Sequence, residues 1–233
     1  MTTEKPSPSR RFFRFCFKTI FYFIIGSVLW VCLYAFVPVP TTITMLTDSN
    51  GATRKWTPLS DISPNMARAV IAAEDSKFCS HDGFDREAIE KAIKTNANRN
   101  SKRGGSTISQ QTAKNAFLWQ GTGYSRYIRK IPEVWFTFLI EKIWGKHRIM
   151  EVYLNIAETG IGTYGAEAGS QRYFEKPAKN LTKQEAARIA AALPSPKKRA
   201  VNGAKGFTRR YGNSIAARIN IVKRDGLDSC IYK

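Results

Sequence analysis

An uncharged apolar segment of nineteen residues, from Thr19 to Val37, most constrains how this chain can fold. At a rise of about 1.5 Å per residue, a helix of this length matches the roughly 30 Å hydrocarbon core of a bilayer. A cleaved signal peptide has a shorter apolar region and a small-x-small exit, and no such exit precedes Pro38. The segment is therefore predicted to be a retained transmembrane helix.

The charges before this segment predict its orientation. Residues 1–18 contain five basic residues and one acidic residue, so the positive-inside rule places the N-terminus in the cytoplasm and everything after Pro38 outside. We expect a basic cytoplasmic tail, a transmembrane helix, an extended linker and a globular domain, at residues 1–18, 19–37, 38–62 and 63–233.

The remainder of the chain is also strongly basic. The whole chain has a net charge of +19, and residues 19–233 keep +15 of it, from 32 basic and 17 acidic residues. Such an excess attracts nucleic acid, an anionic membrane surface or a phosphorylated substrate. The predicted orientation disfavours nucleic acid, which leaves lipid and phosphate.

The domain that follows is predicted to be mainly α-helical. Residues 38–62 are extended, with Thr42–Leu46 as a possible short strand, and helical periodicity begins at Ser63, whose hydroxyl can cap a helix that has Pro64 in its first turn. The expected helices are one after Ser63, Arg86–Asn98, Thr107–Trp119, Ser125–Trp144, Lys146–Glu158, Tyr164–Phe174, one from Thr182 that Pro194 closes, and Phe207–Asp225.

The four cysteines do not form an evident framework. Cys16 and Cys32 lie in or beside the apolar segment, which leaves Cys79 and Cys230. These two can pair only if the fold brings them together, and the sequence leaves that open.

Glu74 stands out within the first helix of the domain. At helical spacing it falls on the same face as apolar residues, namely Ala67, Val70, Ile71 and Phe78. A carboxylate on a core-facing stripe should have a raised pKa, which suits a general acid or base. The alternative is an ordinary helix-end glutamate that faces solvent or bonds to a loop.

A second cluster follows Gly104-Gly105. Ser106 or Thr107 can cap the next helix, and Thr107, Gln111, Lys114 and Asn115 share one polar face of it. Amides, a hydroxyl and one cation on a single face suit a sugar beside a phosphate. A solvated helix face would have the same pattern.

A third cluster is a polar stripe on an otherwise apolar helix. Arg129, Glu133, Thr137 and Glu141 recur at four-residue spacing. The stripe fits either an ordinary ion pair on a helix surface or the wall of a cleft. Two further features are weaker. Metal ligation by Asp75, His81, Asp82 and Asp85 is disfavoured, because these acids equally serve as helix caps. A basic group is expected to face anionic lipid, and it is made of Lys197, Lys198, Arg199, Lys205, Arg209 and Arg210.

Together these clusters resemble glycosyltransferase family 51, and most closely its monofunctional biosynthetic peptidoglycan transglycosylases. The matching motifs occur in the family's order over about residues 60–200. They are E-D-S-K-F-C-S-H-D-G-F-D, G-G-S-T-I-S-Q-Q-T-A-K-N, R-K-I-P-E-V-W-F-T-F-L-I-E, K-H-R-I-M-E-V-Y-L-N-I-A-E-T-G, and G-A-E-A-G-S-Q-R-Y-F-E-K-P with L-T-K-Q-E-A-A downstream.

The resemblance implies a lysozyme-like, two-lobed α domain with one membrane-hugging lobe, anchored in the bacterial inner membrane with its catalytic domain in the periplasm. It implies a glycan polymerase whose donor is a growing chain on undecaprenyl pyrophosphate and whose acceptor is lipid II, with an inverting β-1,4 transfer. Cell-wall synthesis or division proteins are the expected partners, with no nucleic acid.

The resemblance also implies roles for individual residues. Glu74 would be the general base, and Glu133 would assist departure of the pyrophosphate, directly or through a divalent cation (Mg²⁺ or Mn²⁺). No metal held by the protein alone is expected. Lys114, Arg129 and Lys130 would contact the pyrophosphate. The positions that would shape the donor and acceptor sites are Asp75, Phe78, His81, Thr107, Gln111 and Asn115.

Two residues complicate the assignment of these roles to this chain. Pro132 directly precedes Glu133 and would kink a helix that starts well before it. Cys79 lies inside the first motif and could be paired in an oxidising compartment, which would restrict the loop after Glu74.

Two other functions remain open at this stage. One is a membrane-anchored, lysozyme-like lytic glycosidase, because cutting and making a glycosidic bond both need a carboxyl group beside it. The other is a non-catalytic, basic membrane scaffold. Phosphate-binding cations beside the carboxylate favour the polymerase over both.

Overall fold

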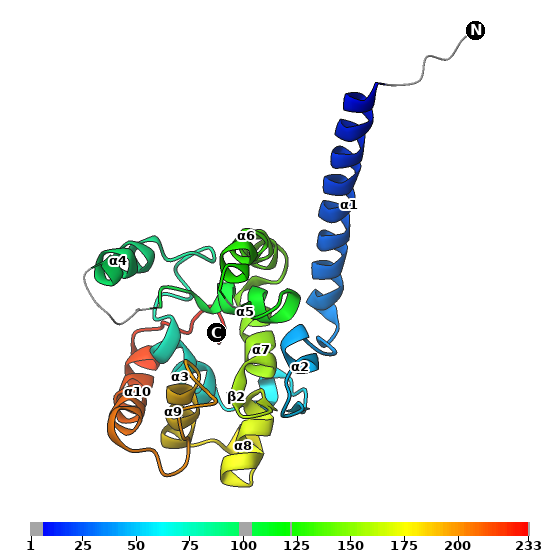
Figure 1. Cartoon of the computed structure of the whole chain (residues 1–233). Coiled ribbons are helices and arrows are strands. Elements are labelled where there is room, and N and C mark those ends of the chain that lie inside the picture. The colour runs from blue at the N-terminus through cyan, green and yellow to red at the C-terminus, as the bar shows by residue number, and fades with distance from the viewer. Residues whose placement is uncertain (1–6, 98–103, 122, 233) are drawn as a thin grey trace.

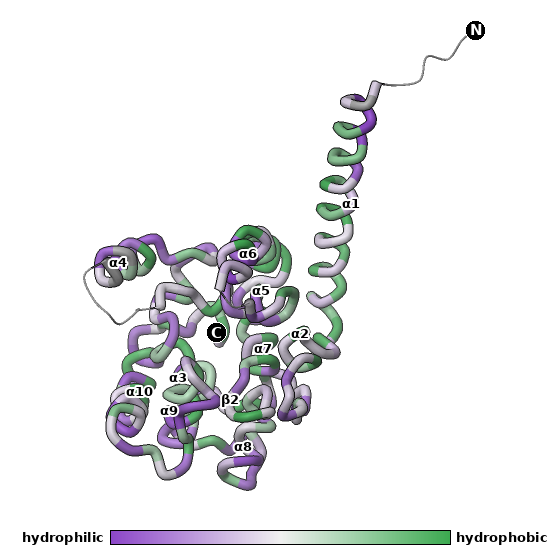
Figure 2. The backbone as a smooth tube through the Cα atoms, in the orientation of Figure 1, coloured by the Kyte–Doolittle hydropathy of each residue, from purple (hydrophilic) through white to green (hydrophobic). Residues whose placement is uncertain are grey.

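A long N-terminal helix, α1 (Pro8–Phe36), projects from a mainly helical domain (Figure 1). The computed structural model describes residues 7–97, 104–121 and 123–232. The expected apolar helix is present and begins earlier than predicted, because Ser7 accepts a hydrogen bond from the backbone of Arg10 and caps it. Within the described residues, Ser9–Phe36 is the one stretch long and apolar enough to cross a membrane. The N-terminal part of α1 stands clear of the domain, and Figure 2 shows its first turns with mixed hydropathy, because basic and apolar residues alternate there, and the turns that follow as mainly apolar.

The lower part of α1 is bonded to the domain. Trp135 Nε1 donates a hydrogen bond to Ser27 Oγ at 2.9 Å, and Trp144 Nε1 donates one to the carbonyl of Val31 at 2.8 Å. Arg148 also donates to the carbonyl of Tyr34 at 2.8 Å. The end of α1 therefore has a fixed place on the domain.

Residues 38–62, expected as an extended linker, also pack on the domain. They contain α2 (Ile43–Leu46), β1 (Thr53–Arg54) and the short helix η1 (Leu59–Asp61). The predicted strand at Thr42–Leu46 is wrong, because Thr42 Oγ1 accepts the backbone N–H of Met45 and starts a helical turn. Arg54 holds the segment by donating to the carbonyls of Val39 and Pro40 at 2.7 and 2.6 Å.

The helices of the domain pack in two groups (Figure 1). One group contains α3, α9 and α10, and the other contains α5, α6 and α7, with the C-terminal part of α1 against α6. The expected mainly α fold is confirmed, and most helix ends lie within two residues of the prediction; Asn98 lies outside the described residues. The bounds are α3 (Pro64–Glu74), α4 (Arg86–Ala97), α5 (Ile108–Phe117), α6 (Ser125–Ile143), α7 (Gly145–Ile156), α8 (Ala166–Phe174), η2 (Ala178–Asn180), α9 (Lys183–Ala192) and α10 (Gly206–Arg224).

A small sheet joins the residues before the domain to its middle. Its strand order is β1-β3-β2, with β2 (Glu158–Gly160) antiparallel and β1 parallel to β3 (Thr163–Tyr164). The sequence predicted helix at both Glu158 and Tyr164. Instead the chain turns back at Gly162, where φ is +61° and a Cβ atom would lie 2.9 Å from the carbonyl oxygen of Asn50.

The C-terminal residues contact α3 and the loop that follows it. Cys230 forms a disulfide with Cys79, so the fold does bring the two together. Arg68 Nε lies 2.6 Å from Asp228 Oδ2, and both side chains are largely buried. The tail is thereby fixed beside the loop that follows Glu74.

Candidate active site

Glu74 is the last residue of α3 and is half-buried at the edge of the core. The apolar residues on its face, Ala67, Val70 and Ile71, are fully buried, as the spacing predicted. Glu74 Oε2 accepts a hydrogen bond from Gln111 Nε2 at 2.8 Å. Burial raises the pKa of Glu74, although the Gln111 hydrogen bond and the charge of Arg199 partly oppose that shift. The carboxyl group is therefore poised to take a proton.

Asp75, the next residue, has a different environment. It is buried, and its Oδ2 accepts the backbone N–H of Ile108 at 3.0 Å, at the first turn of α5. His81 Nε2 lies 3.0 Å from both carboxylate oxygens. Asp75 and His81 thus fix α5 and the loop relative to Glu74. The part of the chain that the structure describes contains no group of three metal-ligating side chains.

Thr107 and Phe78 lie behind the site. Thr107 caps α5 by accepting the backbone N–H of Gln110 at 3.1 Å, and its hydroxyl donates to the carbonyl of Gly83 at 2.7 Å. Phe78 is fully buried, with Lys146 Nζ 4.6 Å from its ring centroid. Both residues therefore shape the site by holding its wall.

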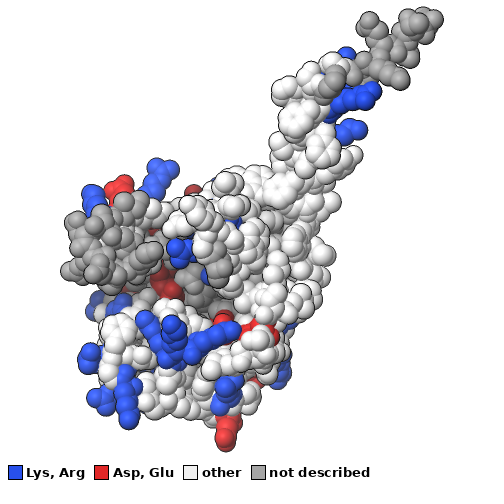
Figure 3. All heavy atoms as spheres, viewed as in Figure 1, with Lys and Arg blue, Asp and Glu red and all other residues white. Residues whose placement is uncertain are grey.

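Three adjoining cavities meet around Glu74 and Gln111. One, of about 590 Å³, contains Glu74 and Gln111 with Arg199, Tyr211 and Arg218 in its wall. The second, of about 200 Å³, also contains Gln111 and is lined by Lys114, Asn115, Tyr153 and Glu158. The third, of about 340 Å³, contains Glu74, Asp75 and Thr107. Figure 3 shows basic side chains on both sides of a hollow in this face of the domain.

Lys114 feels the charges of both carboxylates, Glu74 and Glu133. It is half-buried, and burial together with the charges of Arg129 and Lys130 lowers its pKa, while Glu133 and Glu74 oppose that change. This lysine is the cation of the predicted polar face that lines the cavity, next to Gln111 and Asn115.

Glu133 holds two cations in place on α6. Its Oε2 lies 3.1 Å from Arg129 Nη1, and its Oε1 accepts a hydrogen bond from Lys130 Nζ at 2.5 Å. Both Arg129 and Glu133 are buried, and Arg129 Nε and Nη1 have no hydrogen-bond partner among the described residues. Helix α6 continues through Pro132. Arg129 therefore has donors to spare for an anionic ligand.

The remainder of the predicted stripe on α6 has a structural role. The Thr137 hydroxyl donates to the carbonyl of Glu133 at 2.7 Å. Glu141 accepts hydrogen bonds from Ser109 of α5 and, at 2.7 Å, from Lys146 of α7. Only the Arg129 end of the stripe belongs to the site.

Sequence reasoning missed the wall contributed by the C-terminal third of the chain. Arg199 was assigned to a basic group facing lipid, yet it lines the cavity with Tyr211 and Arg218. The Tyr211 hydroxyl donates to the carbonyl of Ala73 at 2.8 Å, and Arg199 Nη1 donates to the carbonyl of Ala191 at 2.9 Å. No local pattern connects these residues to Glu74, because the contact spans more than a hundred residues of chain.

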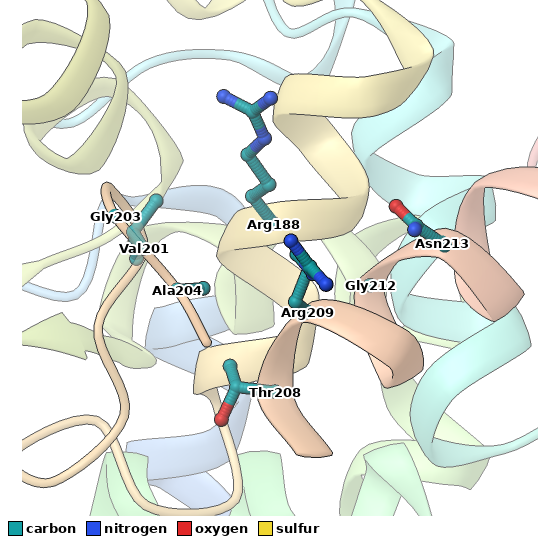
Figure 4. Close-up of a pocket in the computed structure, with 8 residues that line it drawn as sticks. All are labelled: Arg188, Val201, Gly203, Ala204, Thr208, Arg209, Gly212 and Asn213. Atoms are coloured by element: carbon teal, nitrogen blue, oxygen red, sulfur yellow. The ribbon is translucent and has the colours of Figure 1, made fainter. Parts of the chain in front are cut away.

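Another member of that basic group lies elsewhere. Arg209 and Arg188 line a separate cavity of about 250 Å³ between α9 and α10 (Figure 4). None of the predicted site residues is in its wall. This cavity is distinct from the site around Glu74.

The fold and site define a class: a helical glycosyl-transferring enzyme, with a half-buried carboxylate and a set of cations in one cleft behind an apolar N-terminal helix. A family model described as Transglycosylase matches residues 41–220. The chain belongs to this transglycosylase family, so the expected family is confirmed.

Similar proteins share nearly the whole chain. The chain is 47% identical over 226 residues to a biosynthetic peptidoglycan transglycosylase of Caulobacter vibrioides, an alignment that covers 95% of this chain and 97% of that protein. It is 46% identical over 215 residues to one of Bdellovibrio bacteriovorus, covering 87% and 85%. It is also 46% identical over 202 residues to one of Rhodospirillum centenum, covering 85% and 86%.

Proposed function

We propose that this protein polymerises peptidoglycan glycan strands from lipid II and releases undecaprenyl pyrophosphate. The observation that carries this proposal is one cleft with a proton-accepting carboxylate, Glu74, and phosphate-binding cations around Lys114 and Arg129. The shared name of the similar proteins supports the choice of substrate.

Glu74 acts as the general base in this mechanism. It takes the proton of the acceptor 4-hydroxyl as that oxygen attacks the anomeric carbon of the donor sugar. The new carbon–oxygen bond forms on the face opposite the breaking bond, so an α-linked donor becomes a β-1,4 link. The raised pKa of Glu74 brings its basicity closer to that of the group it must deprotonate.

The pyrophosphate leaves with the electron pair of the broken bond. Fixed cations stabilise that developing charge without reorganising. Lys114 supplies one charge from α5, and Arg129 and Lys130 supply two from α6. Glu133 keeps the α6 cations in place, since each of its oxygens contacts one of them.

The described residues do not fit a preformed divalent-metal site. Glu133 was the candidate ligand, and both its oxygens already face cations. Among the described residues, no three His, Cys, Asp or Glu side chains lie close enough together to hold a metal ion. The departure step is therefore assigned to the side-chain cations.

The surface beside α1 suits a bilayer containing the substrate. α6 exposes apolar side chains on its outer face, with exposed fractions from 45% to 77%, namely Tyr127, Ile128, Ile131, Val134 and Phe138. Trp135 of the same helix bonds to Ser27, well inside the apolar span of α1. This face of α6 then lies at membrane depth, next to the lipid anchor of the substrate. The basic residues before the span support a cytoplasmic N-terminus and a periplasmic cleft in the inner membrane.

A lytic glycosidase is the second candidate, and the cations argue against it. A glycan cutter needs the carboxyl group but has no phosphate to bind. Arg129 is buried and Lys114 half-buried, which costs free energy that an anionic ligand would offset. A scaffold that binds cell-wall or division proteins would need neither feature.

Labelled lipid II tests the proposal. The purified full chain in detergent should convert it to polymer, with and without a chelator. Fragments from preformed glycan with no polymer would overturn the function. Polymerisation lost in chelator and restored by Mg²⁺ would overturn the metal-free departure step alone.

A further inference from the structure

Glu158 is a carboxylate of the cleft that none of the preceding steps uses. It is the first residue of β2 and is separated from the end of α7 only by Ala157. Its side chain lines the 200 Å³ cavity together with Gln111, Lys114 and Asn115 of α5. It therefore lies in the wall of the space where the donor sugar would adjoin its phosphate.

Neighbouring residues hold Glu158 without satisfying it. Lys197 Nζ lies 3.6 Å from Oε1, and Oε1 is buried with no hydrogen-bond partner among the described residues. Lys197 instead donates to Asp48 Oδ2 at 3.0 Å, as does the Tyr164 hydroxyl at 2.6 Å. These bonds hold the pKa of Asp48 far below its usual range, so Asp48 keeps its charge and Lys197 remains committed to it.

The strand pairing fixes this arrangement. Glu158 of β2 is in register with Tyr164 of β3. Strand β3 also pairs with β1, which begins a few residues after Asp48, so Asp48 and Glu158 are held on the same small sheet. Burial raises the pKa of Glu158, with the charge of Lys197 opposing that shift. An acceptor held rigidly, with a 3.6 Å contact to Lys197 in place of a hydrogen bond, gains free energy from a ligand that donates one.

The charges around the cavity favour a neutral ligand group. Lys197 lies beside Glu158, and Lys114 lines the same cavity from α5. Lys197 is itself paired with Asp48, so Lys114 and Glu158 offset one another and no net negative charge is left to attract an ammonium group. A sugar hydroxyl or an acetamido N–H supplies the missing hydrogen bond without adding positive charge.

We propose that Glu158 selects the sugar of the donor by accepting a hydrogen bond from one of its hydroxyl or acetamido N–H groups, while Lys114 holds the adjoining phosphate. This inference rests on the proposed polymerase function and deepens it. A substrate that lacks this donor leaves the buried carboxylate oxygen unpaired, which weakens its binding.

The test compares the full-length protein with Glu158→Ala, Glu158→Gln and Lys197→Met. The substrates are lipid II and analogues that each lack one donor, through a deoxy position or an N-methylated acetamide. With wild type, one analogue should lose about tenfold to a hundredfold in kcat/KM, mainly through KM. The kcat/KM of Glu158→Ala on lipid II should be lower than that of wild type by a similar factor. On the discriminated analogue its kcat/KM should fall no further. Glu158→Gln keeps an acceptor oxygen and should recover part of the loss.

The remaining arms separate this inference from its rivals. Lys197→Met keeps the acceptor and should still discriminate among the analogues, whereas discrimination that depends on Lys197 and not on Glu158 would overturn the assignment. A higher kcat/KM on an analogue with a free amine in place of the acetamide would overturn the assignment of a neutral hydrogen-bond donor. Glu90→Ala, an exposed glutamate on α4, is the matched control.

Failure of this inference can be told from failure of the proposed function. If wild type polymerises lipid II and Glu158→Ala has the same KM, the role of Glu158 is refuted and the polymerase function stands. Wild type that forms no polymer refutes the polymerase. Thermal unfolding of each variant confirms that it is folded. If the alanine variant does not fold, Glu158→Gln, which preserves side-chain shape, provides the test instead.

Discussion

Gln111 donates a hydrogen bond through Nε2 to Glu74 Oε2 at 2.8 Å, while its Oε1 accepts one from the Tyr153 hydroxyl at 3.3 Å. Tyr153 is buried, and burial raises its pKa well above the ordinary value, so it keeps its proton and can only donate to an oxygen here. This orients the Gln111 amide, which directs its N–H toward the carboxylate. One oxygen of Glu74 is thereby fixed.

The first prediction concerns the charge of Glu74. Glu74→Gln removes the proton acceptor and should reduce polymerisation of lipid II by at least about a thousandfold, within the range for loss of a general base. The fold should survive, since the change preserves shape and removes a charge whose burial is unfavourable. Glu90→Gln, on the exposed face of α4, should polymerise normally. Normal activity of the Glu74→Gln protein would refute the assigned role.

The same residue predicts how stability depends on pH. The pKa of Glu74 is raised in the folded state, so its contribution to stability is present below about pH 4.5, the ordinary value, and is lost as the pH rises through the folded pKa. The Glu74→Gln protein does not lose this contribution, because its amide does not ionise. Its free energy of unfolding should exceed that of wild type at pH 7, and the difference should shrink toward pH 4. Urea unfolding at both pH values measures this, and a constant difference would contradict it.

Gln111 provides the second prediction, on the pH dependence of the rate. A base works only when deprotonated, so kcat/KM should rise with pH through the pKa of Glu74, above the ordinary 4.5. The Gln111 hydrogen bond lowers that pKa, so Gln111→Leu should move the acidic limb of the profile to higher pH. An unmoved limb with a merely lower plateau would show that Gln111 does not tune Glu74.

Local spacing predicted the parts of the site that lie on single helices. The face shared by Ala67, Val70 and Ile71 is set by α-helical geometry within one element, so the placement of Glu74 could be derived. The same holds for the polar face of α5, where Gln111 and Asn115 do line a cavity. The sequence predicts Thr107 both as a possible cap of α5 and as part of that polar face, and the structure has it buried as the cap and in the wall of the third cavity.

Contacts between distant segments could not be derived. Arg199, which lies between α9 and α10, lines the same cavity as Glu74 because these helices pack on α3, and no periodicity encodes which helices pack together. Glu158 was predicted to end a helix. The chain leaves the helix at Ile156 because β2 pairs with β3, which depends on the turn at Gly162. The sequence leaves the pairing of Cys79 with Cys230 open for the same reason.

The third prediction concerns that disulfide, which closes a loop of 151 residues. A cross-link of this span restricts the unfolded chain, and its loss typically costs about 2–5 kcal/mol in free energy of unfolding. The double variant with Cys79→Ser and Cys230→Ser should show that loss in urea, and wild type treated with a reductant should match it. Arg68 and Asp228 still hold the tail, so both should keep measurable polymerisation when folded. Unchanged stability would mean that the tail is fixed without the bond.

The fourth prediction separates stability from chemistry at the buried pair of Arg129 and Glu133. Each side chain is less than a tenth exposed, so Glu133→Leu leaves a buried guanidinium without its anion and should cost about 3–5 kcal/mol of stability. Replacing both residues, with Arg129→Met added to Glu133→Leu, removes the uncompensated charge, and apolar residues in place of a buried ion pair are often neutral or stabilising. The double variant should therefore be more stable than Glu133→Leu alone.

Activity should not follow stability in this series. The pyrophosphate needs Arg129 as a cation, and the double variant has lost it, so polymerisation of lipid II should stay at least about a hundredfold below wild type despite the recovered fold. Lys130→Met is the matched control, because Lys130 is half-exposed and its removal leaves the pair of Arg129 and Glu133 in place. That variant should lose little stability and only part of the activity. A double variant that polymerises like wild type would show that Arg129 and Glu133 only support the fold, and the leaving group would then depend on Lys114.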